Sequence, residues 1–165
     1  MNNVKERKWA NAYRNQHFIC IHTCSGYRAS VFDPSGRQSL MSIDVDDKTL
    51  GTAVLESLTA SRFLAVDQVG IFFDRKLVAE NYDNWTKDLI VTYRYKSKTA
   101  LFKKMILCNI EMDDHSIVIR PTRHEKLETW GKDNADNILD VLIAVESPPE
   151  EIGEALRLGF SRCVE

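Results

Sequence analysis

The feature that most constrains the fold is a pair of β-type segments separated by the dipeptide Asp113-Asp114. In the segments 105–112 and 115–119, apolar residues recur at every second position over most of their length. This alternation on both sides of a turn dipeptide is the pattern of a β-hairpin. Because strands joined by so short a turn run in opposite directions, this part of the chain predicts an antiparallel sheet.

Further segments have the composition of strands. Residues 17–23 are apolar and rich in β-forming types, and residues 27–32 form another candidate before the turn at 33–36, which has proline at its second position and glycine at its fourth. Residues 41–45 and 69–73 are predicted to be short strands or extended runs. Residues 138–145 are a further apolar strand candidate.

Three segments have the apolar period of amphipathic helices. The first covers residues 47–62, where Asp46 or Asp47 is placed to cap the first turn. A second helix is predicted to begin at Asn81, where large apolar residues follow at steps of three and four. The third covers residues 148–163, with Ser147 as its N-cap and a proline in its first turn. Residues 123–130 are expected to form one or two helical turns.

The order of these elements predicts the fold class. Strands and helices mix without a regular β-α-β alternation, which favours an α+β fold with a mostly antiparallel sheet packed with about three helices. A chain of 165 residues buries about 70% of its surface without disulfides or metals, so we expect a single domain over residues 1–165. The N-terminal segment is polar and no apolar run approaches about 20 residues. We therefore expect a cytoplasmic protein with no membrane partner.

The four cysteines are Cys20, Cys24, Cys108 and Cys163, and they are expected to be free thiols in a reducing compartment. Together with His22, the first two would face one side of a strand at intervals of about 7 Å, which suits a packed face better than one metal ion. The seven glycines are scattered and build no phosphate-binding loop. We therefore predict no metal and no cofactor.

Two segments are compatible with other functions. His124 with Glu125 or Glu128 would supply an acid–base pair for a small enzyme, although Glu128 stands where the zinc-protease pattern needs its second histidine. We favour a structural role, since ion pairs commonly imitate catalytic pairs. Residues 94–98 with Lys103-Lys104 interleave aromatics and lysines, as in a nucleic-acid-binding module. The alternative is the solvated end of one helix and the start of the next.

The net charge of −2 conceals an uneven distribution, because residues 39–85 are net −4 and residues 133–165 are net −6. Acidic blocks suit a basic protein partner, whereas an overall basic footprint for nucleic acid is absent. The most compact acidic cluster is formed by Asp44, Asp46 and Asp47. A Mg²⁺ site is one interpretation of this cluster. Capping of the following helix is the interpretation that we favour, because no calcium-loop motif continues from it.

Several stretches resemble the immunity proteins of bacterial contact-dependent growth inhibition (CDI). The matching stretches are Leu50 to Leu58 with Ser61 to Leu64, Lys98 to Met105, Arg120 to Trp130, and Ile152 to Cys163. They lie in order over most of residues 17–163, so together they are more specific than any one of them.

The resemblance implies a function. Such proteins bind the toxic C-terminal domain delivered by a neighbouring cell and block it, and the toxins are often nucleases, so we expect a nuclease and an RNase first. The family supplies no catalytic residues, so neither enzymatic activity nor direct nucleic-acid binding is expected. Nuclease grooves are basic because they contact phosphates, which favours an acidic contact surface. The surface that we predict to contact the toxin consists of Asp44, Asp46, Asp47, Glu80 and Asp83. A rival acidic surface consists of Asp133, Asp136 and Asp140.

Overall fold

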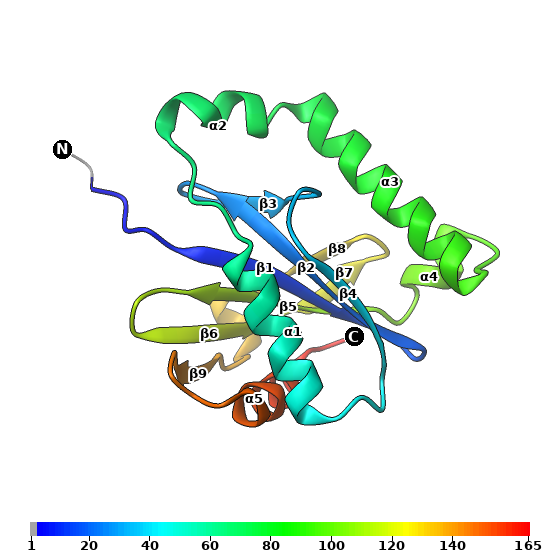
Figure 1. Cartoon of the computed structure of the whole chain (residues 1–165). Helices are drawn as coiled ribbons and strands as arrows, with labels where there is room; N and C mark the ends of the chain where they lie inside the picture. Colours follow the sequence, from blue (N-terminus) through cyan, green and yellow to red (C-terminus); the bar gives the residue numbers. More distant parts are fainter. Residues whose placement is uncertain (1–2) are drawn as a thin grey trace.

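The computed structural model describes residues 3–165, and within this range seven strands form one sheet (Figure 1). The strands of this sheet are β1 (Lys8–Arg14), β2 (Phe18–Gly26), β3 (Ser30–Phe32), β4 (Gln38–Ser42), β5 (Ile106–Met112), β6 (Ser116–Pro121) and β9 (Val141–Ala144). Their order is β3-β2-β1-β5-β6-β9, with β4 paired to the first half of β2, and every pairing is antiparallel. The predicted hairpin is confirmed as β5 and β6, with Ile110 opposite Ile119.

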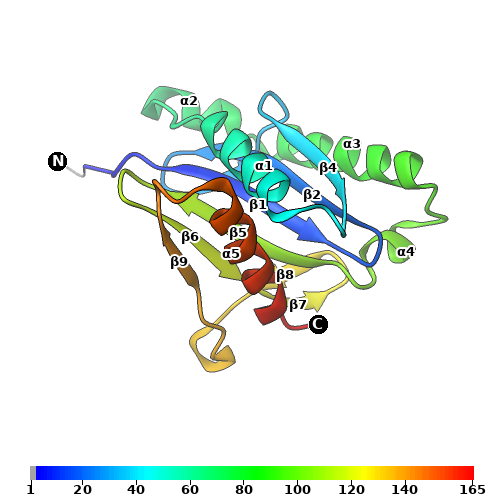
Figure 2. The same cartoon turned by 60° about the horizontal axis from the view of Figure 1, so that its bottom comes forward.

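Five α-helices accompany the sheet in the described range. They are α1 (Asp47–Thr59), α2 (Val66–Phe72), α3 (Arg75–Tyr93), α4 (Lys98–Phe102) and α5 (Pro149–Arg162). Figure 2 shows α1 and α5 side by side on one face of the sheet, with α3 on the other side. The α+β class and the mostly antiparallel sheet are therefore confirmed, and the short helices α2 and α4 are added to the three predicted. No helix within residues 3–165 is long and apolar enough to cross a membrane.

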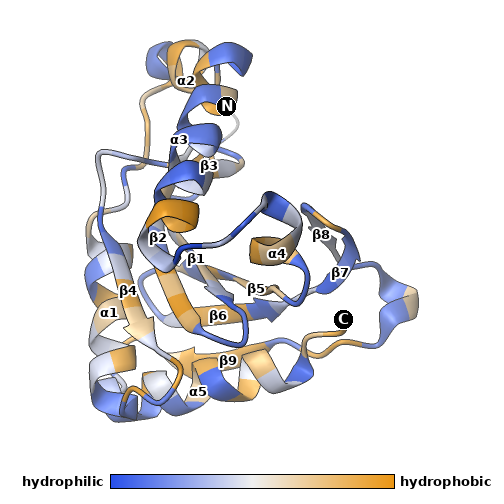
Figure 3. Ribbon diagram, turned by 90° about the vertical axis from the view of Figure 1, so that its right-hand side faces the viewer, coloured by the Kyte–Doolittle hydropathy of each residue, from blue (hydrophilic) through white to orange (hydrophobic). Residues whose placement is uncertain are grey.

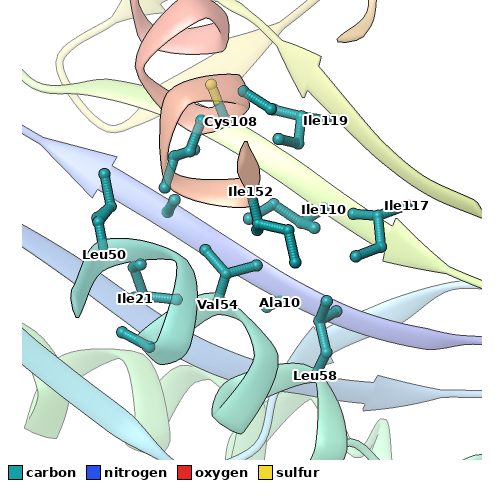
Figure 4. Packing of buried hydrophobic residues seen from close by; sticks show 14 of the residues in the cluster. Ala10, Ile21, Leu50, Val54, Leu58, Cys108, Ile110, Ile117, Ile119 and Ile152 are labelled. Atoms are coloured by element: carbon teal, nitrogen blue, oxygen red, sulfur yellow. The ribbon is translucent and has the colours of Figure 1, made fainter. Parts of the chain in front are cut away.

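Each face of the sheet has its own apolar core, because successive residues of a strand point to opposite faces. On β2, Ile19 and Ile21 belong to the core under α1 and α5, whereas Phe18 and Cys20 belong to the core under α3 and α4. Figure 4 shows the first core, where the side chains of both helices meet those of the strands.

Helices α1 and α5 touch backbone to backbone at a pair of glycines. A Cβ atom added at Gly51 would lie on the carbonyl oxygen of Pro149, and one added at Gly153 would lie on the carbonyl oxygen of Asp47. Any larger residue at either position would push the two helices apart and open the core beneath them.

Strand β1 lies at the centre of the sheet, between β2 and β5, yet the sequence predicts no strand there. Its inner positions are the small residues Ala10 and Ala12, which are buried under the helices of the first core. Asn11 lies between them, so the segment lacks the large apolar alternation that marks a strand in the sequence.

Two predictions of local structure are wrong. Residues 69–73, predicted as a strand or extended run, lie mostly in α2, where the Gln68 side chain accepts from the backbone N–H of Ala65 at 3.2 Å. Residues 123–130, predicted as helical turns, form the hairpin of β7 (Arg123–Lys126) and β8 (Thr129–Gly131). The backbone N–H of His124 donates to the carbonyl of Val164 at 2.7 Å, a pairing with the C-terminus that no local pattern reveals.

Several boundaries also differ from those predicted. The strands expected at 27–32 and 41–45 are β3 and β4, and they begin at Ser30 and Gln38. Helix α3 begins at Arg75 rather than at Asn81. Helix α5 has Pro148 at its N-cap position in place of Ser147, and no side chain caps it.

Candidate functional site

The acidic loop, defined here as residues 43–47 between β4 and α1, carries three of the predicted site residues. Asp46 is the N-cap of α1, and its carboxylate accepts from the backbone N–H and from the hydroxyl of Thr49, at 2.7 Å and 3.0 Å. These two hydrogen bonds lower the pKa of Asp46. The carboxylate therefore stays charged at neutral pH while it holds the start of the helix.

Asp47 and Asp44 have different surroundings. The Arg157 guanidinium of α5 donates to the Asp47 carboxylate at 2.7 Å and also to the carbonyl oxygens of Ile43 and Val45. This contact partly neutralises the loop. Asp44 and Asp46 are both exposed, so these two charges are the ones in the loop that a partner meets most directly.

Glu80 and Asp83 do not join the acidic loop. Both are exposed on α3, which packs through Trp85 and Leu89 on the sheet face opposite to α1. Asp83 also lies 4.0 Å from the Lys98 ammonium. The predicted surface is therefore divided into two groups of carboxylates on opposite sides of the sheet.

The rival acidic surface is largely neutralised by neighbouring cations. The backbone N–H of Asp133 donates to the Asp136 carboxylate and, together with the ion pair to Arg123, lowers the pKa of Asp136. Asp140 is paired with Lys132 and lies 3.7 Å from the Arg120 guanidinium. Asp133 caps the short 3-10 helix at Asn134–Asp136, where its carboxylate accepts from the backbone N–H of Ala135.

Among the residues weighed as metal ligands, Cys20 belongs to the core under α3 and α4, which is called the second core from here on. Cys20, His22 and Cys24 are buried, and the His22 ring is stacked on Phe32 at 4.3 Å and lies 5.2 Å from the Trp85 ring. Burial lowers the pKa of His22 to about 3, so the imidazole is neutral. Among residues 3–165, no three histidine, cysteine or acidic side chains are grouped so that they could hold a metal ion.

The histidine–carboxylate pair has structural contacts. The His124 ring lies flat on Trp130 at 5.0 Å, and its Nε2 donates to the carbonyl of Leu127 at 2.8 Å, since a carbonyl can only accept. The Glu128 carboxylate accepts from the Tyr82 hydroxyl at 2.9 Å instead of facing His124. Glu125 is exposed at the neighbouring strand position.

The basic stretch at 94–98 does not offer its aromatics to a ligand. Tyr93 is stacked on Phe18 at 4.2 Å, and the Tyr95 hydroxyl accepts from the Asn15 amide at 2.8 Å. Base-stacking proteins need exposed ring faces, whereas these rings are partly buried against the second core. Lys96 lies between α3 and α4, and Lys98 is the first residue of α4, which agrees with the alternative of a helix end and a helix start. Lys103 and Lys104 follow the end of α4.

A surface that sequence reasoning missed lies on α2 and the first turns of α3. We call it the apolar arm and define it by Val66, Ile71 and Leu77, whose exposed fractions are 69%, 75% and 38%. No residue of α2 is buried, and Figure 3 shows its apolar turns at the opposite end of the molecule from α5. Exposed apolar groups of this kind mark surfaces that a partner covers.

A hollow of about 550 Å³ adjoins the apolar arm. It is lined by Ser30, Val31, Phe32, Phe73, Arg75, Val78, Ala79 and Tyr82. The hollow lies between β3 and the start of α3, and Glu80 and Asp83 follow on the same helix. Val78 and Tyr82 are four positions apart, which is the spacing of one helix face. This spacing is the sequence signal that could have moved the predicted start of the helix from Asn81 back to Val78.

Comparison with known proteins gives the family. A family model described as CDI immunity protein (CdiI) matches residues 8–163. The chain belongs to the CDI immunity protein family. The resemblance found in the sequence is thus confirmed.

Relatives of this CDI immunity protein match over nearly their whole length. Immunity protein CdiI-YPIII of Yersinia pseudotuberculosis serotype O:3 is 43% identical, over 99% of both chains. A chain in the solved CdiA-CT/CdiI toxin and immunity complex from Yersinia pseudotuberculosis is 40% identical, with a TM-score of 0.89 over 98% of this chain and 99% of that one. A protein of unknown function, NMB0488 from Neisseria meningitidis, is 34% identical, with a TM-score of 0.90 over 99% of both chains.

The stretches that carried the resemblance lie mainly in the scaffold of the CDI immunity protein. Residues 50–58 are in α1 and residues 152–163 run through α5, where the two helices cross. Residues 98–105 include α4, and residues 120–130 include most of the hairpin of β7 and β8. These stretches explain why the fold is shared, whereas the acidic loop and the apolar arm lie outside them.

Proposed function

We propose that this protein binds and neutralises the cognate CdiA C-terminal toxin domain in the cytoplasm of the protected cell. The observation that carries the proposal is the likeness to a chain of the solved toxin and immunity complex, 40% identical over 98% of this chain. We expect the toxin to be a nuclease, and an RNase first. Inhibition follows from binding and not from catalysis, and residues 1–165 act as a single domain.

The carboxylates of the acidic loop and those of Glu80 and Asp83 on α3 have different roles in the proposed binding. A standard protein interface covers about 800 Å² on each partner, so one toxin domain contacts one side of the sheet. We place the contact at the apolar arm, because its exposed Ile71 and the adjoining hollow offer apolar surface, with Glu80 and Asp83 at the edge. Asp44, Asp46 and Asp47 lie across the sheet and act through their field, which attracts a basic domain.

Growth of cells that express the toxin domain tests the proposal. The toxin is the C-terminal domain of the cognate CdiA protein, and it is expressed with or without the chain. We expect growth to stop with the toxin alone and to continue when the chain is present. His124→Ala should protect equally, because the His124 ring has only structural contacts. If growth also stops in cells that contain folded and abundant wild-type protein, the proposed function is rejected.

A further inference from the structure

Two of the four cysteines meet where α5 ends over the central part of the sheet. Cys108 is fully buried on β5, and Cys163 follows the last turn of α5 and is partly exposed. Their sulfur atoms are 3.6 Å apart. Figure 4 shows Cys108 beneath α5. A Cβ atom added at Gly159 would lie 3.2 Å from the Cys108 sulfur, so the glycine allows the helix to approach this thiol.

We propose that Cys108 and Cys163 form a redox modification site, in which a peroxide converts the two thiols into an intramolecular disulfide. An S–S bond is about 2.05 Å long, so the sulfurs must approach by about 1.5 Å. Cys163 lies past the end of α5, where its side chain can turn toward Cys108 while the helix and β5 remain in place.

The chemistry takes two balanced steps. The Cys163 thiolate attacks one oxygen of hydrogen peroxide and becomes a sulfenic acid, while the O–O bond breaks and the second oxygen leaves as water after taking up a proton. The Cys108 sulfur then attacks the Cys163 sulfur, the S–O bond breaks and a second water leaves. Two electrons pass from the pair of thiols to one peroxide, and no other reactant is needed.

The surroundings of the two thiols assign their roles. The hydrogen bond with Cys108 lowers the pKa of Cys163, and burial opposes this shift. Contacts with the backbone of Thr122 and Leu107 and the nearby Lys132 ammonium act in the lowering direction. The same hydrogen bond, together with burial, raises the pKa of Cys108. Because Cys163 is partly exposed and Cys108 is fully buried, peroxide reaches Cys163 first, and Cys108 then resolves the sulfenic acid. Burial raises the pKa of Cys20 to about 12, so that thiol stays inert.

A disulfide here would fasten the C-terminal segment to the centre of the sheet. Val164, the next residue, is held by hydrogen bonds to Thr122 and His124, so the segment already pairs with the start of β7. The cross-link would add a covalent connection between β5 and the end of α5. Closing a long loop of chain in this way restricts the unfolded state and raises stability.

The test treats the full chain with hydrogen peroxide at a few equivalents and counts free thiols after unfolding. We expect the thiols to fall from four to two and to return to four with dithiothreitol. Mass spectrometry of the unreduced digest should show the peptides of Cys108 and Cys163 joined within one chain. The melting temperature of the oxidised protein should rise by about 4–10 °C, the range for a disulfide in a chain of this size.

Matched variants separate the roles of the two thiols. Cys108→Ser should leave Cys163 as a sulfenic acid that dimedone labels, and Cys163→Ser should keep its remaining three thiols reduced under the same treatment. Cys20→Ala should still lose two thiols. The proposal is overturned if all four wild-type thiols persist, if Cys163 is overoxidised while Cys108 stays free, or if the cross-links join separate chains. A lower melting temperature of the oxidised protein would also contradict it.

Discussion

The Arg157 side chain of α5 donates a hydrogen bond to the Asp47 carboxylate at 2.7 Å and ties the middle of α5 to the first turn of α1. Its guanidinium also donates to the carbonyl oxygens of Ile43 and Val45 in the acidic loop. One side chain therefore fixes the loop and supports the crossing of two helices at Gly51 and Gly153. This contact joins residues 110 positions apart, so it depends on the tertiary fold.

We expect Arg157→Ala to lower the free energy of unfolding by about 1–3 kcal/mol, because carbonyl and carboxylate acceptors lose their charged donor. Both side chains of the Arg157–Asp47 pair are about one-third exposed, at 33% and 37%, which limits the loss. Urea unfolding at pH 7 measures the change. The control is Arg37→Ala, which breaks the more exposed pair with Glu56 and should cost less than about 1 kcal/mol. Equal losses in the two variants would contradict this role for Arg157.

Local pattern predicted the parts of the fold that local interactions determine. The hairpin of β5 and β6 alternates clearly, and the Asp113 carboxylate accepts from the backbone N–H groups of His115 and Ser116 at its turn. Strand β1 was missed because Ala10 and Ala12, which it buries in the core under α1 and α5, are small. Its central place comes from its pairing with β2 and β5, which the local sequence does not show. The hairpin of β7 and β8 was missed because Val164 pairs with it from the far end of the chain.

The candidate site was predicted less well than the fold. The sequence identified Asp44, Asp46 and Asp47 as a cluster and expected one of them to cap a helix, and Asp46 does so. The net charge of residues 39–85 could not show that Glu80 and the acidic loop lie on opposite sides of the sheet. A net charge summed over a segment does not tell which face each residue occupies. The apolar arm was missed because Ile71 lies in residues 69–73, which were predicted to be a short strand or extended run and not a helix.

The pH dependence of stability should report on His22. Below pH 6.5 the unfolded chain binds a proton at His22, whereas burial lowers the pKa of the folded imidazole to about 3. Stability due to this group is therefore complete above about pH 6.5 and falls by roughly 1.4 kcal/mol per pH unit below it. We expect His22→Phe to reduce the loss of stability between pH 6.5 and pH 4.5 in urea unfolding. His115→Gln, at an exposed position, should leave the loss unchanged, and an unchanged slope in His22→Phe would refute the prediction.

The acidic loop should affect the rate of association with the toxin domain. Asp44→Asn combined with Asp46→Asn removes two charges, and asparagine keeps the helix cap. We expect association to slow about two- to fivefold at low salt, with little difference at high salt, because the loop acts through its field. The matched control is Glu6→Gln with Asp114→Asn, at two exposed positions, one before β1 and one in the turn between β5 and β6. If both double variants associate alike, the charge of the loop does not attract the toxin domain.

The apolar arm should determine how long the complex lasts. We expect Ile71→Asp to raise the dissociation constant about tenfold or more, mainly through faster dissociation, because it places a charge in a contact that excludes water. The side chain is 75% exposed in the free protein, so folding should be unaffected. Val91→Asp is the matched control, since Val91 is 76% exposed near the other end of α3. Comparable weakening by both substitutions would show that the arm is not the contact.

Titration of the purified toxin domain with this protein tests the central claim most directly, because it separates neutralisation by binding from inactivation by catalysis. We predict that toxin activity falls in proportion to the added protein, reaches zero near one equivalent and does not depend on the time of incubation. Full toxin activity in the presence of excess folded protein would contradict the account. Progressive loss of activity at a small fraction of an equivalent would contradict it as well, since one molecule would then be acting on many.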